Sequence, residues 1–213
     1  EVDFAQRDGI YTAGVFHAFR RQHQTLRLAN FSMTVNALGL IRVSPSALFF
    51  NPQYLVFQMY MNHQGPLLAP TEVEAPAFAA PEYEEGRPQA ISRIHYLDAS
   101  ATVSEDGGTL YLAVINLHDS KPVLTRVEIE GWQPDPAGKA IWLDADHYMT
   151  ENSFEQPDRV RISEKPLASV GQAMSYPFPP HSVTILELTR RPRAAAQRSA
   201  LDDLCILLRA PNR

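Results

Sequence analysis

The sequence predicts a mixed fold in which a short helix–strand–helix layer precedes an antiparallel β-sandwich. Two observations lead to this prediction. The hydrophobic period changes along the chain from that of helices to that of strands, and a proline-rich segment, residues 65–90, separates the two regions. The 213 residues suffice for one large domain or two small ones, and 45% of them are hydrophobic, which is typical of a folded protein.

Composition also excludes several classes of function. A net charge of −5 argues against binding to nucleic acid or to an anionic membrane. The single cysteine, Cys205, excludes an internal disulfide and any multi-cysteine metal site. No apolar run approaches the ~18 residues that span a bilayer, and the acidic start at Glu1 is unlike a secretory signal. We therefore expect a cytoplasmic protein without nucleic-acid or membrane partners.

The first region, residues 1–64, contains two predicted helices. Residues 8–24 are apolar on nearly every face, with Asp8 as the N-cap, which indicates a helix buried on most sides. Residues 26–29 form a short apolar run that predicts a strand. Asn51-Pro52 is a helix start that should lead to about Asn62. Such an incomplete α/β layer cannot close a core by itself.

Residues 65–90 contain five prolines and five glutamates, so they cannot hold a long helix and are expected to form an extended connector. The region that follows, 91–189, has the period of strands. A hairpin is predicted over 103–117, since Asp106-Gly107-Gly108 is a turn signal. Alternation over 126–130, ended by Gly131, and apolar runs at 140–143 and 182–188 bring the total to at least five strands, which indicates a sandwich.

Two interpretations remain open for residues 190–213. One is a loosely attached, disordered tail. The other is a short amphipathic helix, because Leu201, Leu204, Cys205 and Leu208 lie at helical spacing.

The candidate binding groups in the sequence also have simpler structural roles. The seven histidines show no zinc-like spacing, so no metal and no cofactor are expected. Five aromatic residues could form a sugar-stacking platform, although core packing is the commoner role for aromatic side chains in a sandwich: Tyr111, Trp132, Trp142, Tyr148 and Tyr176.

Four motifs, in order, carry a family resemblance. They are residues 8–41, residues 96–118, residues 151–160 and residues 179–188. Together the four motifs resemble the C-terminal part of the α-L-arabinofuranosidases of glycoside hydrolase family 51, and the tail after Leu188 lies outside the resemblance. The resemblance implies the C-terminal end of a (β/α)₈ barrel followed by a jelly-roll-like sandwich. It also implies retaining removal of arabinofuranosyl groups from plant polysaccharides, usually by a homo-oligomer.

The resemblance also suggests site residues. Glu1 is the acidic residue nearest the position of the family's catalytic nucleophile, while the acid/base belongs to a barrel strand that this chain lacks. Asn30 and Met33 would lie in the loop after the last barrel strand, where Met33 replaces a glutamine of many family members and leaves substrate preference open. For Asn30 and Asn36, capping of the backbone is the simpler role.

This chain alone is therefore expected to be inactive, with an arabinose-containing oligo- or polysaccharide as the parent enzyme's substrate. Its expected partner is a second copy or the missing N-terminal barrel portion. Two alternatives stay open, a carbohydrate-binding module and a packing element for barrel and oligomer assembly. Related enzymes differ in sugar, so an arabinofuranoside and a glucan are not distinguished.

Overall fold

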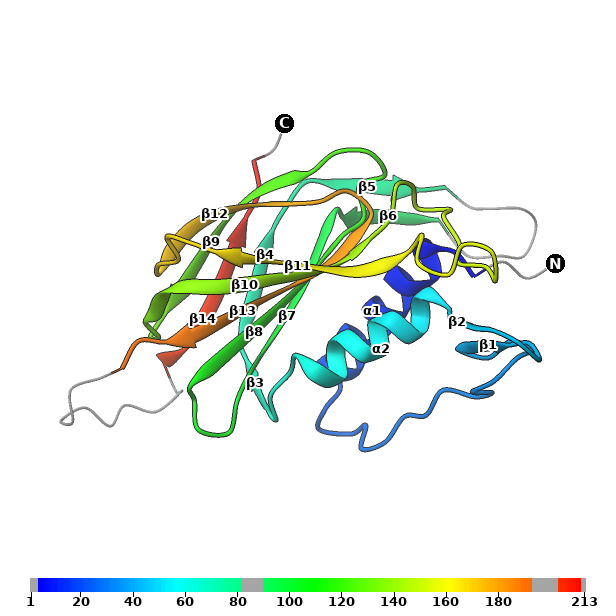
Figure 1. Cartoon of the computed structure of the whole chain (residues 1–213). Coiled ribbons are helices and arrows are strands. Elements are labelled where there is room, and N and C mark those ends of the chain that lie inside the picture. The colour runs from blue at the N-terminus through cyan, green and yellow to red at the C-terminus, as the bar shows by residue number, and fades with distance from the viewer. Residues whose placement is uncertain (1–3, 82–89, 193–202, 212–213) are drawn as a thin grey trace.

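The computed structural model describes residues 4–81, 90–192 and 203–211. Two β-sheets stack face to face, and a pair of helices lies against the outer face of the larger sheet (Figure 1). The larger sheet has the order β11-β10-β13-β8-β7-β3, and the smaller has the order β12-β9-β14-β4. This arrangement confirms the predicted β-sandwich.

The bounds of the elements are as follows. The larger sheet contains β3 (Leu67–Ala69), β7 (Leu97–Val103), β8 (Thr109–Asn116), β10 (Pro134–Asp144), β11 (Arg161–Leu167) and β13 (Ser182–Arg190). The smaller contains β4 (Thr71–Glu74), β9 (Val123–Glu130), β12 (Ala173–Phe178) and β14 (Cys205–Arg209). Two further strand pairs and the helices complete the fold: β1 (Ile41–Val43) with β2 (Leu48–Phe50), β5 (Ala77–Ala80) with β6 (Ile91–His95), α1 (Gln6–Arg21) and α2 (Pro52–Asn62).

Strand β8 is buried on both faces. Leu110, Leu112 and Val114 contribute to the core between the two sheets, whereas Ala113 and Ile115 belong to a second core beneath the helices. This double burial explains why residues 110–115 form a continuous apolar run rather than an alternating one. The predicted hairpin is confirmed as β7 and β8, with Gly107 at φ +70° in the turn.

Both predicted helices are present, although α1 spans Gln6–Arg21 where residues 8–24 were predicted. The helix begins at Gln6, so Asp8 lies in the first turn instead of at the N-cap. There its carboxylate accepts a hydrogen bond from the backbone N–H of Ala5 at 2.9 Å, which satisfies one of the free donors at the helix start. The α2 helix starts with Pro52 in its first turn and ends at Asn62, as predicted.

The predicted strand at 26–29 is not formed. The segment between α1 and β1 runs outside the helix pair, and within the described ranges no strand lies beside residues 26–29 (Figure 1). Leu28 is 75% exposed. A strand is stabilised by ladder hydrogen bonds to a neighbour, so an apolar run without a neighbour does not become one.

The predicted connector is extended, but residues 67–74 belong to the sandwich and β5 pairs with β6 in a separate two-stranded sheet. Strand β3 pairs with β7 in the larger sheet, and β4 pairs with β14 in the smaller one. Pro66, Pro70 and Pro76 fall between the strands, where a missing backbone N–H breaks no ladder. These prolines therefore divide the segment into short strands. Residues 82–89 lie outside the described residues.

The interpretation of residues 190–213 as a loose tail or a helix is wrong for residues 205–209. Strand β14 lies inside the smaller sheet, antiparallel to β9 and parallel to β4. Leu204, Ile206 and Leu208 alternate into the core between the sheets, at exposures of 3% or less. A short apolar run fits a helix or a strand, and here the position between two other strands decides in favour of a strand.

The burial of β14 leads to a first prediction. Ile206→Ala should lower the free energy of unfolding by about 2–5 kcal/mol, because it opens a cavity in the core. Leu207→Ala is the matched control, since this half-buried side chain lies on the other face of the same strand, and it should cost clearly less. Urea denaturation of both variants would check this prediction. Equal, small effects would mean that β14 is not part of the folded core.

Candidate functional site

The loop after α1 carries the two residues that the resemblance suggests for substrate binding. Asn30 is exposed and lines a cavity of about 330 Å³ between α1, α2 and this loop. Met33 is 55% exposed on the same loop, with a left-handed backbone at φ +62°. The structure therefore places both residues on one exposed loop, with Asn30 at a cavity.

Asn36 holds this loop in shape. Its side-chain Oδ1 accepts a hydrogen bond from the backbone N–H of Val43 at 2.8 Å, and its own backbone N–H donates to the carbonyl of Ile41 at 2.8 Å. Asn36 has φ +54°, a conformation that asparagine tolerates better than most residues. The predicted backbone-capping role is confirmed for Asn36.

The cavity beside Asn30 has aromatic walls and one buried acceptor. Phe57 contacts Phe16 and Phe31 edge-on, with ring centroids 4.7 and 5.8 Å apart. Gln53 is 7% exposed, and its Oε1 has no hydrogen-bond partner in the part of the chain that the structure describes. A buried acceptor without a donor is costly, so this cavity suits a group that brings an N–H or O–H.

A second, more polar cavity lies beside the β1–β2 pair. Its volume is about 310 Å³, and its lining includes Asn36, Arg42 and Glu151. The Arg42 guanidinium stacks on the ring of Phe4 at 4.6 Å. Carboxylates, guanidinium and amide groups offer complementary donors and acceptors for the hydroxyl groups of a small polar ligand. The suggested nucleophile, Glu1, lies outside the described residues, so its role stays a prediction.

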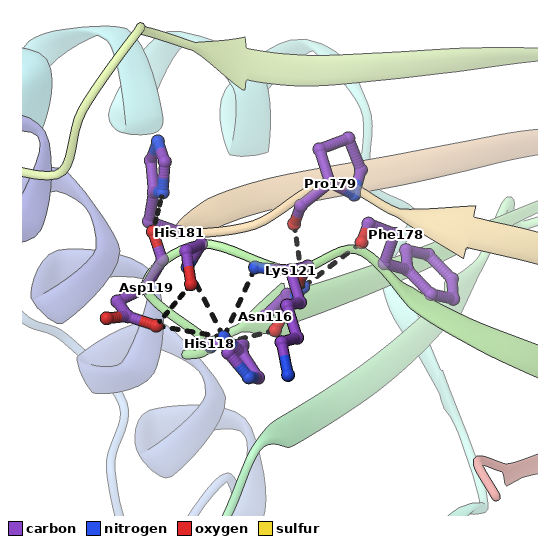
Figure 2. A network of polar contacts seen from close by, with 8 residues as sticks. Asn116, His118, Asp119, Lys121, Phe178, Pro179 and His181 are labelled. Carbon is purple, nitrogen blue, oxygen red and sulfur yellow. Dashed lines mark hydrogen bonds and ion pairs between the residues drawn. The ribbon is translucent and has the colours of Figure 1, made fainter. Parts of the chain in front are cut away.

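A buried network at one end of the sandwich was not found by sequence reasoning (Figure 2). The fully buried Asn116 lies at the end of β8. Its side-chain Nδ2 donates to the carbonyl oxygens of Pro179 at 2.8 Å, Phe178 at 3.0 Å and Lys121 at 3.2 Å. Its Oδ1 accepts from the backbone N–H of His118 at 2.9 Å. Asn116 thus joins the turn after β8 to the turn before β13.

His181 extends this network toward the helices. Its Nδ1 lies 2.6 Å from the carbonyl oxygen of Asp119, and its backbone N–H donates to the carbonyl of His118 at 2.7 Å. The carbonyl oxygen of His181 in turn accepts from Nε2 of Gln6 on α1 at 2.7 Å. His181 and Asp119 also line a cavity of about 610 Å³ between α1 and the larger sheet. The network therefore shapes one wall of this cavity.

The proposed sugar-stacking platform is not assembled. Trp132 and Tyr176 are 1% and 5% exposed, and Trp132 donates from Nε1 to the carbonyl of Gly107 at 3.0 Å. Trp142 and Tyr176 both lie against the ammonium group of Lys165. Core packing, the simpler interpretation, is thus confirmed for Trp132 and Tyr176. Tyr148, 37% exposed, lines the cavity beside α1 instead.

Comparison with known families decides the assignment. Residues 3–182 match the model of the α-L-arabinofuranosidase C-terminal domain. This chain belongs to that family. No curated protein matches it significantly. The family membership agrees with the resemblance based on the four sequence motifs.

Solved structures agree with the family. The α-L-arabinofuranosidase of Thermotoga maritima, solved with arabinose, superposes with a TM-score of 0.82 at 27% identity, over 89% of this chain and 39% of that one. The family 51 enzyme of Thermotoga petrophila gives 0.81 at 28% identity, over 88% and 39%. The enzyme of Xanthomonas axonopodis pv. citri gives 0.69 at 25%, over 89% and 36%. The chain thus spans well under half the length of these enzymes.

The Asn116 network leads to a second prediction. Asn116→Ala should lower the free energy of unfolding by about 3 kcal/mol, because buried carbonyl groups lose their donor. Asn62→Ala, at the exposed end of α2, is the matched control and should change stability little. Thermal and urea unfolding of the two variants would check this. A loss no larger for Asn116→Ala than for Asn62→Ala would contradict it.

Proposed function

We propose that this chain is the C-terminal portion of a retaining α-L-arabinofuranosidase, in which α1, residues 26–29 and α2 are the last elements of a (β/α)₈ barrel. The membership of the family and the 39% coverage of the Thermotoga enzymes support this proposal. The observation that carries it is the apolar segment of residues 26–35, in which residues 26–29 have no partner strand within the described residues.

This segment is too apolar for a free surface loop. Leu28, Met33 and Val35 are 75%, 55% and 52% exposed, and Leu26 and Phe31 are 36% and 38% exposed. Full burial of such a side chain is worth about 1.5–3 kcal/mol. In a (β/α)₈ barrel each strand pairs with a strand on both sides and is covered by helices. A barrel portion on a preceding segment of the parent protein would supply such neighbours.

The same proposal explains why this chain alone should be inactive. Retaining hydrolysis needs two carboxyl groups ~5 Å apart, one as nucleophile and one as acid/base. The nucleophile attacks the anomeric carbon while the acid protonates the leaving oxygen, and the same acid/base then activates the water that releases the sugar. The family resemblance places at most the nucleophile, as Glu1, on this chain. Asn30 and Met33 would line the loop beside the sugar, where a methionine cannot donate a hydrogen bond.

Packing and assembly form a second part of the proposal. Tyr11 on α1 is 74% exposed and lines the cavity of about 610 Å³ together with Ile10, Val15 and Ala18. An apolar cavity beside an exposed aromatic ring is typical of a surface that packs on another part of a protein. The barrel portion, or a second copy of the chain, is the occupant that we propose.

The proposed function leads to a third prediction. The chain alone should show no hydrolysis of an aryl α-L-arabinofuranoside above the uncatalysed rate. A fusion of this chain to the part of the T. maritima enzyme that precedes the matched region should hydrolyse it, with retention in the anomeric product by NMR. The fusion carrying Leu28→Asp is the control, because a charge in the restored barrel should abolish folding or activity. Activity of the chain alone, or an inactive fusion that is folded, would contradict the proposal.

A further inference from the structure

A buried polar chain joins the helix pair to the larger sheet. His17 on α1 has no exposed side-chain surface. Its Nδ1 lies 3.1 Å from Oδ2 of Asp98 on β7, and its Nε2 lies 2.7 Å from the hydroxyl oxygen of Tyr60 on α2. We call Asp98, His17 and Tyr60 the polar latch, because each residue comes from a different element. The latch ties α1, α2 and β7 together at one point.

When His17 is neutral, each hydrogen atom in the latch can be assigned to one donor. Burial raises the pKa of Tyr60, so its hydroxyl keeps its proton and donates to Nε2 of His17. Since Nε2 is then an acceptor, Nδ1 carries the ring proton and donates to Asp98. Burial acts to raise the pKa of Asp98, but the hydrogen bonds from His17 and Arg21 and the charge of Arg21 oppose it, and this pKa is lowered. Neutral His17 thus makes one hydrogen bond as a donor, to Asp98, and one as an acceptor, from Tyr60.

A protonated His17 does not fit this arrangement. Its Nε2 would become a donor facing the Tyr60 hydroxyl, so the hydroxyl hydrogen would need another acceptor in a site where Tyr60 is 3% exposed. Two cations lie close by. The Arg20 guanidinium stacks on the Tyr60 ring at 4.8 Å, and Arg21 forms an ion pair with Asp98. Burial is the main cause that lowers the pKa of His17, Arg20 and Arg21 add to it, and Asp98 opposes it.

Tyr60 of the latch belongs to one of two separate cores. The helices and the outer face of the larger sheet form one hydrophobic cluster, and the space between the sheets holds the other. The helix pair can therefore separate from the sheet without opening the core between the sheets. We propose that the polar latch is an acid-sensitive release, in which protonation of His17 breaks its bond with Tyr60 and loosens α1 and α2 while the sandwich stays folded. This inference does not depend on the proposed function.

The pH range in which the helices loosen follows from the direction in which the pKa of His17 and that of Asp98 are shifted. A histidine whose pKa is lower in the docked state than its ordinary 6.5 stabilises docking fully above pH 6.5 and less as the pH falls through that value, because the released state takes up the proton more readily. Asp98, with a pKa below its ordinary 3.8, loses its contribution only at still lower pH. Between pH 6.5 and about 4, His17 is therefore the residue of the polar latch whose protonation loosens docking.

Hydrogen–deuterium exchange of this chain at pH 7.5 and pH 5.0 tests the proposal, after correction for the intrinsic pH dependence of exchange. The amides of α1 and α2 should lose about tenfold more protection than those of β8 and β13. His17→Gln should abolish this difference, because glutamine does not titrate. His23→Gln, at an exposed histidine just after α1, is the matched control and should keep it. The proposal would be overturned if the amides of α1 and α2 were equally protected at both pH values. It would also be overturned if their extra loss of protection at pH 5.0 persisted in His17→Gln.

An NMR titration of the His17 ring in the unchanged protein provides a second test, which holds even if His17→Gln fails to fold. The pKa of His17 should lie below 6.5. Tyr60→Phe should raise it, because the lost hydroxyl donates only to the neutral ring. A residue with a merely structural role would not show this shift. A His17 pKa at or above 6.5 in the unchanged protein, or the same His17 pKa in Tyr60→Phe, would overturn the proposal.

Discussion

Burial of the larger sheet on both faces is the constraint on which the remaining structure depends. On one face its strands pack against the smaller sheet, and on the other Ile115, Ile141 and Ile185 meet the helix pair. Without the helices this second face would expose a broad apolar surface to water. The helices that precede the sandwich in sequence therefore cover its second apolar face, even though the two regions differ in period.

The helix pair has two sides with different surroundings. Toward the sheet it is well packed, and the buried His17 and Gln6 add specific polar contacts there. On the other side the loop with Leu28 and Met33 leaves apolar side chains exposed. This difference between the two sides, together with the 39% coverage of the Thermotoga structures, supports the proposal that the chain is a portion of a larger enzyme.

The candidate site could be predicted only where it depends on neighbouring residues in sequence. The capping by Asn36 was foreseeable, because its partners lie within seven residues. The roles of Asn116 and His17 were not, since their partners Pro179 and Asp98 lie 63 and 81 residues away. A polar residue ending an apolar run, as Asn116 does, was the one available signal. Sequence alone does not show which distant carbonyl groups such a residue will meet.

Local physical chemistry in the sequence determined both helices, the β7–β8 hairpin and the division of residues 65–80 at its prolines, because these features depend on capping, turn residues and missing backbone donors. Tertiary structure alone decided two apolar runs of ambiguous type. Residues 26–29 remained unpaired, whereas residues 205–209 became a strand between β9 and β4. The physical reason is the same in both cases: a strand exists only where another strand offers its backbone hydrogen bonds.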